Sequence, residues 1–164
     1  MGVNLSAFAK DIPSGSRVCL DSAVSIYHLE GIEPWVPLTT ALVASIAEGN
    51  MGAVISTVSI TELLTKFFGP KGLESKLLEN AEIFLQTLPN CLIRSTSYGI
   101  ARLGAKLRAN FGLRTPDALI AATGISERAT HFITNDVKLL RLGSEQFNVI
   151  VLKNYVAPTP TEQP

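Results

Sequence analysis

Four acidic residues in this sequence have positions that suit a shared site. Each lies among apolar neighbours, and they are Asp21 in VCLDSAV, Glu62 in SITELL, Asp117 in TPDALIAAT and Asp136 in FITND. Carboxylates that crowd together in a partly buried pocket repel each other, so they either take up protons or hold cations. An oxygen-rich set with no cysteine and few histidines suits Mg²⁺ or Mn²⁺. The pattern therefore predicts a divalent metal site.

Each of these acids, taken alone, also has a purely structural explanation. Acidic side chains near helix N-termini are stabilised by the helix dipole and by free N–H groups. Glu62 stands three residues after Ser59, which is the spacing of a capping box. Asp21 and Asp136 can be N-caps of the helices that follow them. Caps need not lie near one another, whereas the ligands of one metal must meet.

The elements expected around the acids favour a meeting point. Between residues 17 and 156, short apolar runs alternate with helical patterns, which predicts a single three-layer α/β domain. Its mostly parallel sheet of about five strands is expected to be flanked by helices. Strands are predicted at 17–21, 53–58, 91–95, 131–136 and 148–155. Helices are predicted at 23–31, 39–50, 59–69, 73–88, 98–112, 115–128 and 137–143. Sites in such sheets form beyond the carboxyl ends of the strands, where three of the acids are expected.

The remaining segments and the composition narrow the class of protein. Residues 1–16 lack a clear period and are predicted to form an N-terminal arm, and 157–164, rich in proline and polar residues, a disordered tail. The 14 basic and 14 acidic residues cancel, so attraction for phosphate must come from local clusters or bound metal. No apolar run is long enough to cross a membrane and no signal peptide is visible. The two cysteines stand in no metal-binding spacing and are interpreted as free thiols. Free thiols are typical of the reducing cytosol, so we expect a cytoplasmic protein.

Four segments together resemble the acidic motifs of PIN domains, and especially those of VapC-type toxins from toxin–antitoxin pairs. They are VCLDSAVSIYHLEG, VSITELL, LRTPDALIAAT and HFITND. Their order and rough spacing match the family, and the resemblance spans about residues 17–152. It implies a ribonuclease in which Asp21, Glu62, Asp117 and Asp136 bind Mg²⁺ or Mn²⁺ and cut RNA phosphodiester bonds.

The resemblance also assigns roles to the neighbours of the four acids. Ser22 and Thr134 occupy the family's small polar positions, and we expect them to orient ligands or substrate. Arg114, just before the third motif, and Lys138, after the fourth, are predicted to hold the RNA backbone, and Arg141 lies near Lys138. The competing interpretation of these cations is a solvated charged face.

The expected partners are an RNA substrate, an antitoxin protein that wraps the helices after the first two strands, and a second copy of the chain. The apolar face of the helix predicted at 39–50 hints at this homodimer. Two other functions stay open. One is a non-toxic RNA-processing nuclease, and the other is a non-catalytic RNA-binding or protein-interaction module whose acids are only caps.

Three further residues attract attention. His28 and His131 lie beside apolar residues and pair with no serine or cysteine motif, so structural roles are favoured for both. Trp35, in the loop EPWVP, suits either stacking on a base or packing within its loop.

Overall fold

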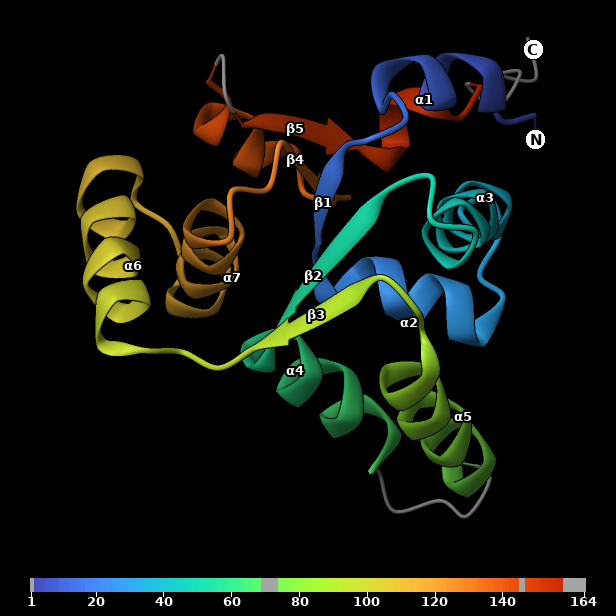
Figure 1. The fold of residues 1–164 in the computed structure, drawn as a ribbon, viewed down its shortest axis with the longest axis horizontal. Coiled ribbons are helices and arrows are strands. Elements are labelled where there is room, and N and C mark those ends of the chain that lie inside the picture. Colours follow the sequence, from blue (N-terminus) through green and yellow to red (C-terminus); the bar gives the residue numbers. More distant parts are fainter. Residues whose placement is uncertain (1, 69–73, 145–146, 158–164) are drawn as a thin grey trace, which may run out of the picture.

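A parallel sheet of five strands forms the centre of the molecule (Figure 1). The computed structural model describes residues 2–68, 74–144 and 147–157. The strands lie in the order β3-β2-β1-β4-β5, and every neighbouring pair is parallel. Their bounds are β1 (Arg17–Leu20), β2 (Gly52–Ser56), β3 (Cys91–Arg94), β4 (His131–Thr134) and β5 (Asn148–Val151). The predicted fold class, a parallel α/β sheet flanked by helices, is confirmed.

Helices cover both faces of this sheet. Those bounded in the structure are α1 (Leu5–Asp11), α2 (Ser22–Glu30), α3 (Val36–Ala47), α4 (Thr57–Phe67), α5 (Glu74–Thr87), α6 (Tyr98–Phe111) and α7 (Thr115–Ser126). The described residues also contain two 3-10 helices, η1 (Val137–Leu142) and η2 (Leu152–Tyr155). Helices α6 and α7 lie on one side of the sheet, and α1, α2 and α3 on the other (Figure 1).

The alternation of side chains along β1 explains these layers. Val18 and Leu20 point into one core, which they share with residues of α1, α2 and α3. Cys19, between them, points into the other core, which contains the buried face of α7. Successive side chains of a strand face opposite ways, so a strand that is apolar throughout must be covered twice. The central strand therefore requires three layers.

Helix α7 lies unusually close to β1. A Cβ built on Gly124 would lie 2.7 Å from Cys19 Cβ, a distance that real atoms do not reach. Only glycine permits this approach, and the small side chains of Ala121 and Ala122 beside it are fully buried. Gly124 lies in the last turn of α7, so the close contact fixes the C-terminal part of this helix against β1.

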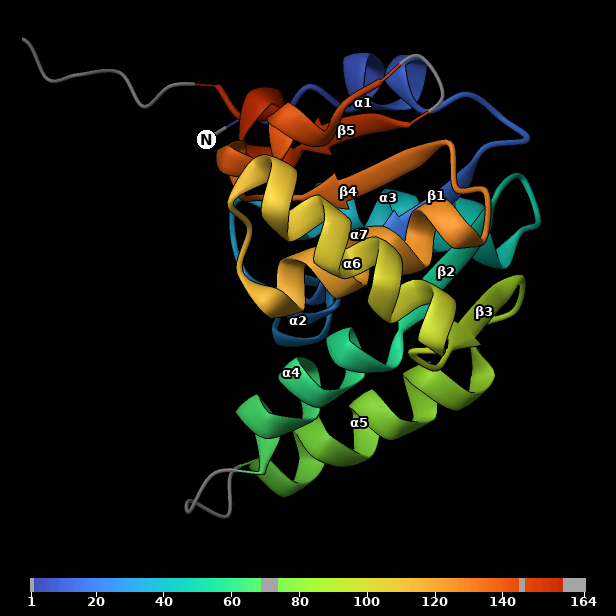
Figure 2. The same cartoon turned by 90° about the vertical axis from the view of Figure 1, so that its left-hand side faces the viewer.

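Helices α4 and α5 lie side by side beyond the β3 end of the sheet (Figure 2). Leu63 and Phe67 of α4 pack on Ala81 of α5 in a small third core. Within the described residues, no helix is long and apolar enough to cross a membrane.

Several predicted boundaries were wrong. Helix α3 begins at Val36 rather than at residue 39, because Pro37 is tolerated in its first turn. Strand β5 ends at Val151 and continues as η2. Residues 5–11, predicted as part of an arm without clear period, form helix α1, whose Phe8 is 3% exposed and packs edge-on against Tyr155. The predicted tail lies, from residue 158 on, outside the described residues.

The apolar face of α3 does not form a free surface. Leu38, Leu42 and Ile46 are all buried in the chain's own core. The sequence pattern that hinted at a homodimer is therefore explained within one chain.

Candidate functional site

Asp21 stands directly after β1 and caps α2. Its Oδ1 accepts a hydrogen bond from the Ser22 N–H at 2.8 Å, and its Oδ2 accepts one from Thr134 Oγ1 at 2.6 Å. Thr134 is the last residue of β4, which pairs with β1, so the parallel register brings this hydroxyl to the carboxylate. Both oxygens of Asp21 are thereby held in place at the carboxyl edge of the sheet.

Glu62 reaches the same edge from α4. Its Oε2 accepts a hydrogen bond from Ser22 Oγ at 2.7 Å, so Ser22 contacts two of the four acids. The predicted capping box was wrong. Ser56, not Ser59, is the N-cap of α4, and its Oγ accepts from the Val58 N–H. The helix starts two residues earlier than predicted, and Glu62 therefore lies beyond its first turn.

Asp117 lies in the first turn of α7 and is 8% exposed. Arg114 holds both of its oxygens, with Nε 2.9 Å from Oδ2 and Nη2 3.1 Å from Oδ1. The side chain of Arg114 is itself 76% exposed. Thr115 is the first residue of α7, and Arg114 occupies the N-cap position but does not cap the helix with its side chain.

Asp136 is the N-cap of η1. Its Oδ1 accepts from the Lys138 N–H at 2.8 Å, and its own N–H donates to Thr134 Oγ1 at 3.1 Å. Thr134 thus links Asp136 to Asp21 through one buried hydroxyl. The strand that precedes Asp136 ends two residues earlier than predicted.

The four acids line one cavity of about 360 Å³. They come from four separate segments of the chain, and Arg114 and Ser22 line the cavity with them. Burial raises the pKa of the Asp21 carboxyl above its ordinary value, and the carboxylates of Glu62 and Asp117 add to this, against hydrogen bonds from Thr134 and Ser22 that lower it. The ion pair with Asp117 raises the pKa of the Arg114 guanidinium. The cavity therefore disfavours a further negative charge and favours a cation.

The carboxylates are not arranged as a ready metal cage. In the described parts of the chain, no group of three or more His, Cys, Asp or Glu side chains could hold a metal ion as it lies. Arg114 instead neutralises Asp117, and backbone and hydroxyl donors take up oxygens of Asp21 and Asp136. What the structure brings together is an acidic cavity containing one guanidinium.

A comparison with protein families supplies the assignment. The model of the PIN domain matches residues 18–145, which is most of the chain and includes all four acids. The chain belongs to the PIN-domain family. A comparison with curated proteins found no significant match.

Solved structures share the fold of this PIN domain. A VapBC2 complex from Rickettsia felis, bound to a DNA fragment from its promoter, superposes with a TM-score of 0.62 at 20% identity and covers 81% of this chain and 98% of that chain. A toxin–antitoxin complex from Klebsiella pneumoniae gives 0.61 at 20% identity, covering 84% and 98%. VapBC-1 from nontypeable Haemophilus influenzae gives 0.60 at 19% identity, also covering 84% and 98%. At these identities the likeness establishes the fold.

Two residues that sequence reasoning missed also line the acidic cavity of this PIN domain. They are Tyr27 of α2 and Asn135, whose Nδ2 donates to Tyr27 Oη at 3.2 Å. Asn135 could have been found, because it lies between Thr134 and Asp136 at the end of a strand. Nothing in the sequence around Tyr27 indicated its place, since it depends on stacking against Trp35 with ring centres 5.7 Å apart.

The other candidate residues lie away from the acids. Trp35 is half-buried and packs on Tyr27, which agrees with a packed loop aromatic. His131 begins β4 at the opposite end of the strand from Thr134, and His28 contacts Phe84. Neither histidine lines the acidic cavity.

Proposed function

We propose that this PIN domain is a metal-dependent ribonuclease that hydrolyses RNA phosphodiester bonds and is the toxin of a type II toxin–antitoxin pair. The observation that carries the proposal is the meeting of Asp21, Glu62, Asp117 and Asp136 in one cavity beyond the carboxyl ends of parallel strands. Folding alone gives no reason to crowd four carboxylates there, because their mutual repulsion is unfavourable.

The donor set of this cavity fits Mg²⁺ or Mn²⁺. Asp21, Glu62, Asp117 and Asp136 supply only carboxylate oxygens, which these hard cations prefer. Burial, together with the nearby carboxylates of Glu62 and Asp117, raises the pKa of Asp21, and a bound cation would stabilise its charged form. Arg114 already places one positive group there, and its exposed side chain can leave Asp117 when a metal enters. When bound, the metal lowers the pKa of a water and polarises the phosphoryl oxygens.

The neighbouring residues hold two of the four carboxylates in place. Ser22 and Thr134 orient Asp21, and Ser22 orients Glu62 as well. Arg114 and Lys138 bind the RNA backbone. A guanidinium released from Asp117 can form two parallel hydrogen bonds with a phosphate group. Lys138 supplies a second positive charge from η1.

The proposed protein partner is an antitoxin. The similar solved structures include a toxin–antitoxin complex from Klebsiella pneumoniae, which supports such a partner here. Its extended segment would cover α2 and α4 and block the cavity. Exposed Phe68, directly after α4, offers an apolar contact for it. The proposal also includes a homodimer and a cytoplasmic location, both from the family resemblance, and the mass of the purified protein by light scattering tests the dimer.

The proposal is tested with purified protein, Mn²⁺ and single-stranded RNA. We expect cleavage that leaves a 5′-phosphate and a 3′-hydroxyl and that stops on chelation. Asp21→Asn should abolish it. Glu79→Gln, on the exposed face of α5 in an ion pair with Lys76, removes an equal charge outside the cavity and should cleave normally. No degradation by the wild type, or equal degradation by Asp21→Asn, would overturn the proposal.

One observation favours a second candidate, a non-catalytic interaction module. Asp21 and Asp136 do cap α2 and η1, and Arg114 already neutralises Asp117. A calorimetric titration with Mn²⁺ separates the two candidates, because the module predicts no heat of metal binding. Growth arrest on expression, relieved by Asp21→Asn, separates a toxin from a non-toxic processing nuclease.

A further inference from the structure

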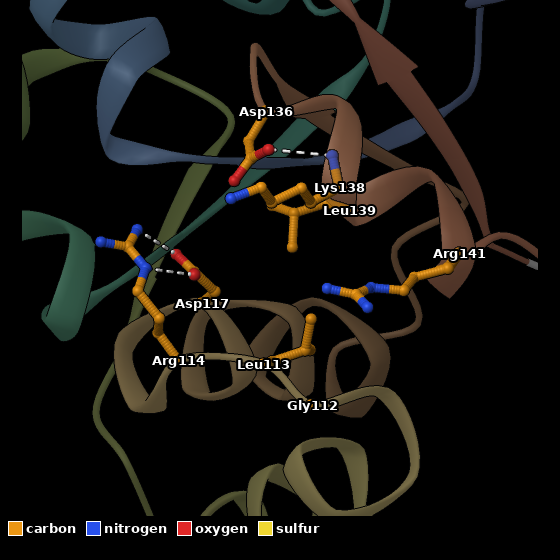
Figure 3. Close-up of a pocket in the computed structure, with 8 residues that line it drawn as sticks. All are labelled: Gly112, Leu113, Arg114, Asp117, Asp136, Lys138, Leu139 and Arg141. Atoms are coloured by element: carbon orange, nitrogen blue, oxygen red, sulfur yellow. Dashed lines mark hydrogen bonds and ion pairs between the residues drawn. The ribbon is translucent and has the colours of Figure 1, made fainter.

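A second and larger cavity adjoins the acidic one (Figure 3). Its volume is about 810 Å³, and it shares Arg114, Asp117 and Asp136 with the acidic cavity. The rest of its lining comes from the loop before α7 and from η1, and consists of Gly112, Leu113, Lys138, Leu139 and Arg141. A ligand bound at the acids can therefore extend into this space without leaving the protein surface.

Basic side chains outnumber acidic ones around this cavity. Arg114, Lys138 and Arg141 line it together with Asp117 and Asp136, in a chain whose formal net charge is zero. In Figure 3 the guanidinium of Arg141 points into the cavity from the side opposite Arg114. Neither Lys138 nor Arg141 forms an ion pair with any residue in 2–68, 74–144 or 147–157. Both cations are therefore available for an anionic ligand.

Two leucines lie in the inner wall of the cavity, and each presents a small apolar patch to it. Leu113 is 5% exposed and Leu139 is 1% exposed, so the core behind them fixes both. Gly112 ends α6 with φ +61°, which turns the chain sharply, and Arg108 Nε donates to Leu113 O at 3.1 Å. The combination of a rigid apolar wall with exposed cations suits a ligand that has one flat apolar part and one anionic part.

We propose that this cavity is a subsite for one nucleotide of single-stranded RNA, next to the phosphate held at the four acids. Lys138 and Arg141 bind its phosphate, and its base lies against Leu113 and Leu139. The inference rests on the proposed function, because it takes the acidic cavity as the cleavage site. A base can enter only when it is unpaired and unstacked, as in single-stranded RNA recognition. Duplex RNA is therefore excluded from productive binding.

Binding can be measured without cleavage. In the Asp21→Asn background, a fluorescent single-stranded RNA octamer is titrated at several salt concentrations. Arg141→Ala should weaken binding about tenfold, the effect of one charge-assisted contact. It should also reduce the slope of log K against log salt by about 0.7, the value for one phosphate contact with a single strand. Arg141→Lys, which keeps the charge, should restore most of the slope.

The matched control is Arg102→Ala, which removes an exposed arginine of α6 outside both cavities. It should leave the affinity and the slope unchanged. With Asp21 intact, Arg141→Ala should raise KM and leave kcat close to the wild-type value. A duplex of the same sequence should bind at least tenfold more weakly than the single strand.

Three outcomes overturn the subsite. One is an effect of Arg141→Ala no larger than that of Arg102→Ala while the wild type still cleaves RNA, which leaves the proposed function intact. Another is equal binding of duplex and single strand. The last is competition by an oligo-aspartate peptide as strong as that by RNA, which would indicate a general anion site. Conversely, binding that depends on Arg141 in a protein that never cleaves RNA would support the cavity and overturn the nuclease.

Discussion

Polar side chains at the two ends of the parallel sheet have different hydrogen-bond partners. At the amino end, side chains bond to the backbone. Thr130 Oγ1 lies 3.1 Å from the Arg17 carbonyl oxygen and 3.2 Å from its nitrogen, and Asn90 Nδ2 donates to Ile46 O at 2.9 Å. At the carboxyl end, hydroxyls instead hold carboxylates, with Thr134 on Asp21 and Ser22 on Glu62. The hydrogen bonds at the amino end join neighbouring segments of the chain, and those at the carboxyl end position charged side chains.

This difference separates stability from function. Neutral hydrogen bonds to the backbone each contribute about 1 kcal/mol to the free energy of unfolding. At the other end, burial and, to a smaller extent, the carboxylates of Glu62 and Asp117 raise the pKa of Asp21, so the charged form of Asp21 works against the fold. Charged groups whose arrangement lowers the stability of the fold are typical of sites that bind a ligand. Substitutions at the two ends should therefore have opposite signatures.

The largest contrast is expected for Asp21→Asn. Cleavage should fall at least about 1000-fold, or about 4 kcal/mol of activation free energy, because the substitution removes a proposed metal ligand. In metal-free buffer the midpoint of thermal unfolding should stay the same or rise, since a buried charge is removed while the asparagine oxygen still accepts from Ser22. Steady-state kinetics and calorimetry measure the two effects. A large fall of the midpoint in chelator would mean that Asp21 serves mainly as a cap.

The next effect is that of Thr134→Val, which keeps the shape of the side chain and removes the 2.6 Å hydrogen bond to Asp21. Cleavage should fall about 10- to 100-fold, as expected when a group that orients a metal ligand is lost. Because that hydrogen bond lowers the pKa of Asp21, its loss raises the pKa, and the acid limb of the pH–rate profile should move to higher pH.

The matched control is Thr130→Val, directly before β4 at the amino end. It should lower the free energy of unfolding by about 1 kcal/mol and leave the pH–rate profile unchanged. If both threonines affected stability alone, the two ends of the sheet would not differ in the way described.

The smallest effect is a pH dependence of stability with opposite signs at the two ends. Burial lowers the pKa of His131 from its ordinary 6.5. The contribution of neutral His131 to the free energy of unfolding is therefore complete above pH 6.5 and is lost as the pH falls through the lowered pKa. The pKa of Asp21 is raised from 3.8, so its contribution is complete below pH 3.8 and is lost as the pH rises through the raised pKa. Neither slope can exceed about 1.4 kcal/mol per pH unit.

Urea unfolding in chelator from pH 4 to 8 measures these slopes. Asp21→Asn should remove the loss on the alkaline side of pH 3.8, and His131→Gln should flatten the loss below pH 6.5. If Asp21→Asn left the dependence of the free energy of unfolding on pH unchanged, the pKa of the Asp21 carboxyl would not be raised in the folded protein.

The sheet and the convergence of the acids could be predicted from the sequence because both depend on short-range patterns. Apolar runs such as RVCLD identify buried strands, and carboxyl ends of parallel strands must share one edge. The first residues of the helices were harder to predict from the sequence. The segment AVISTV has β-branched residues to its end, yet Ser56 caps a helix from Thr57, because a side-chain cap overrides propensity.

Other features depend on contacts that no local pattern contains. Tyr27 lies at the cavity because Trp35 stacks on it, and helix α1 is ordered by Phe8 packing against Tyr155, 147 residues away along the chain. The ion pair of Arg114 with Asp117 has a helical spacing that is visible in the sequence. Its place inside the acidic cavity follows only from the way α7 docks on β1.

A crystal soaked in Mn²⁺ and measured near the manganese absorption edge shows whether the four carboxylates hold a metal ion. We expect an anomalous peak among the carboxylates of Asp21, Glu62, Asp117 and Asp136, with Arg114 displaced from Asp117. An empty cavity at millimolar Mn²⁺, with the ion pair between Arg114 and Asp117 intact, would contradict this expectation.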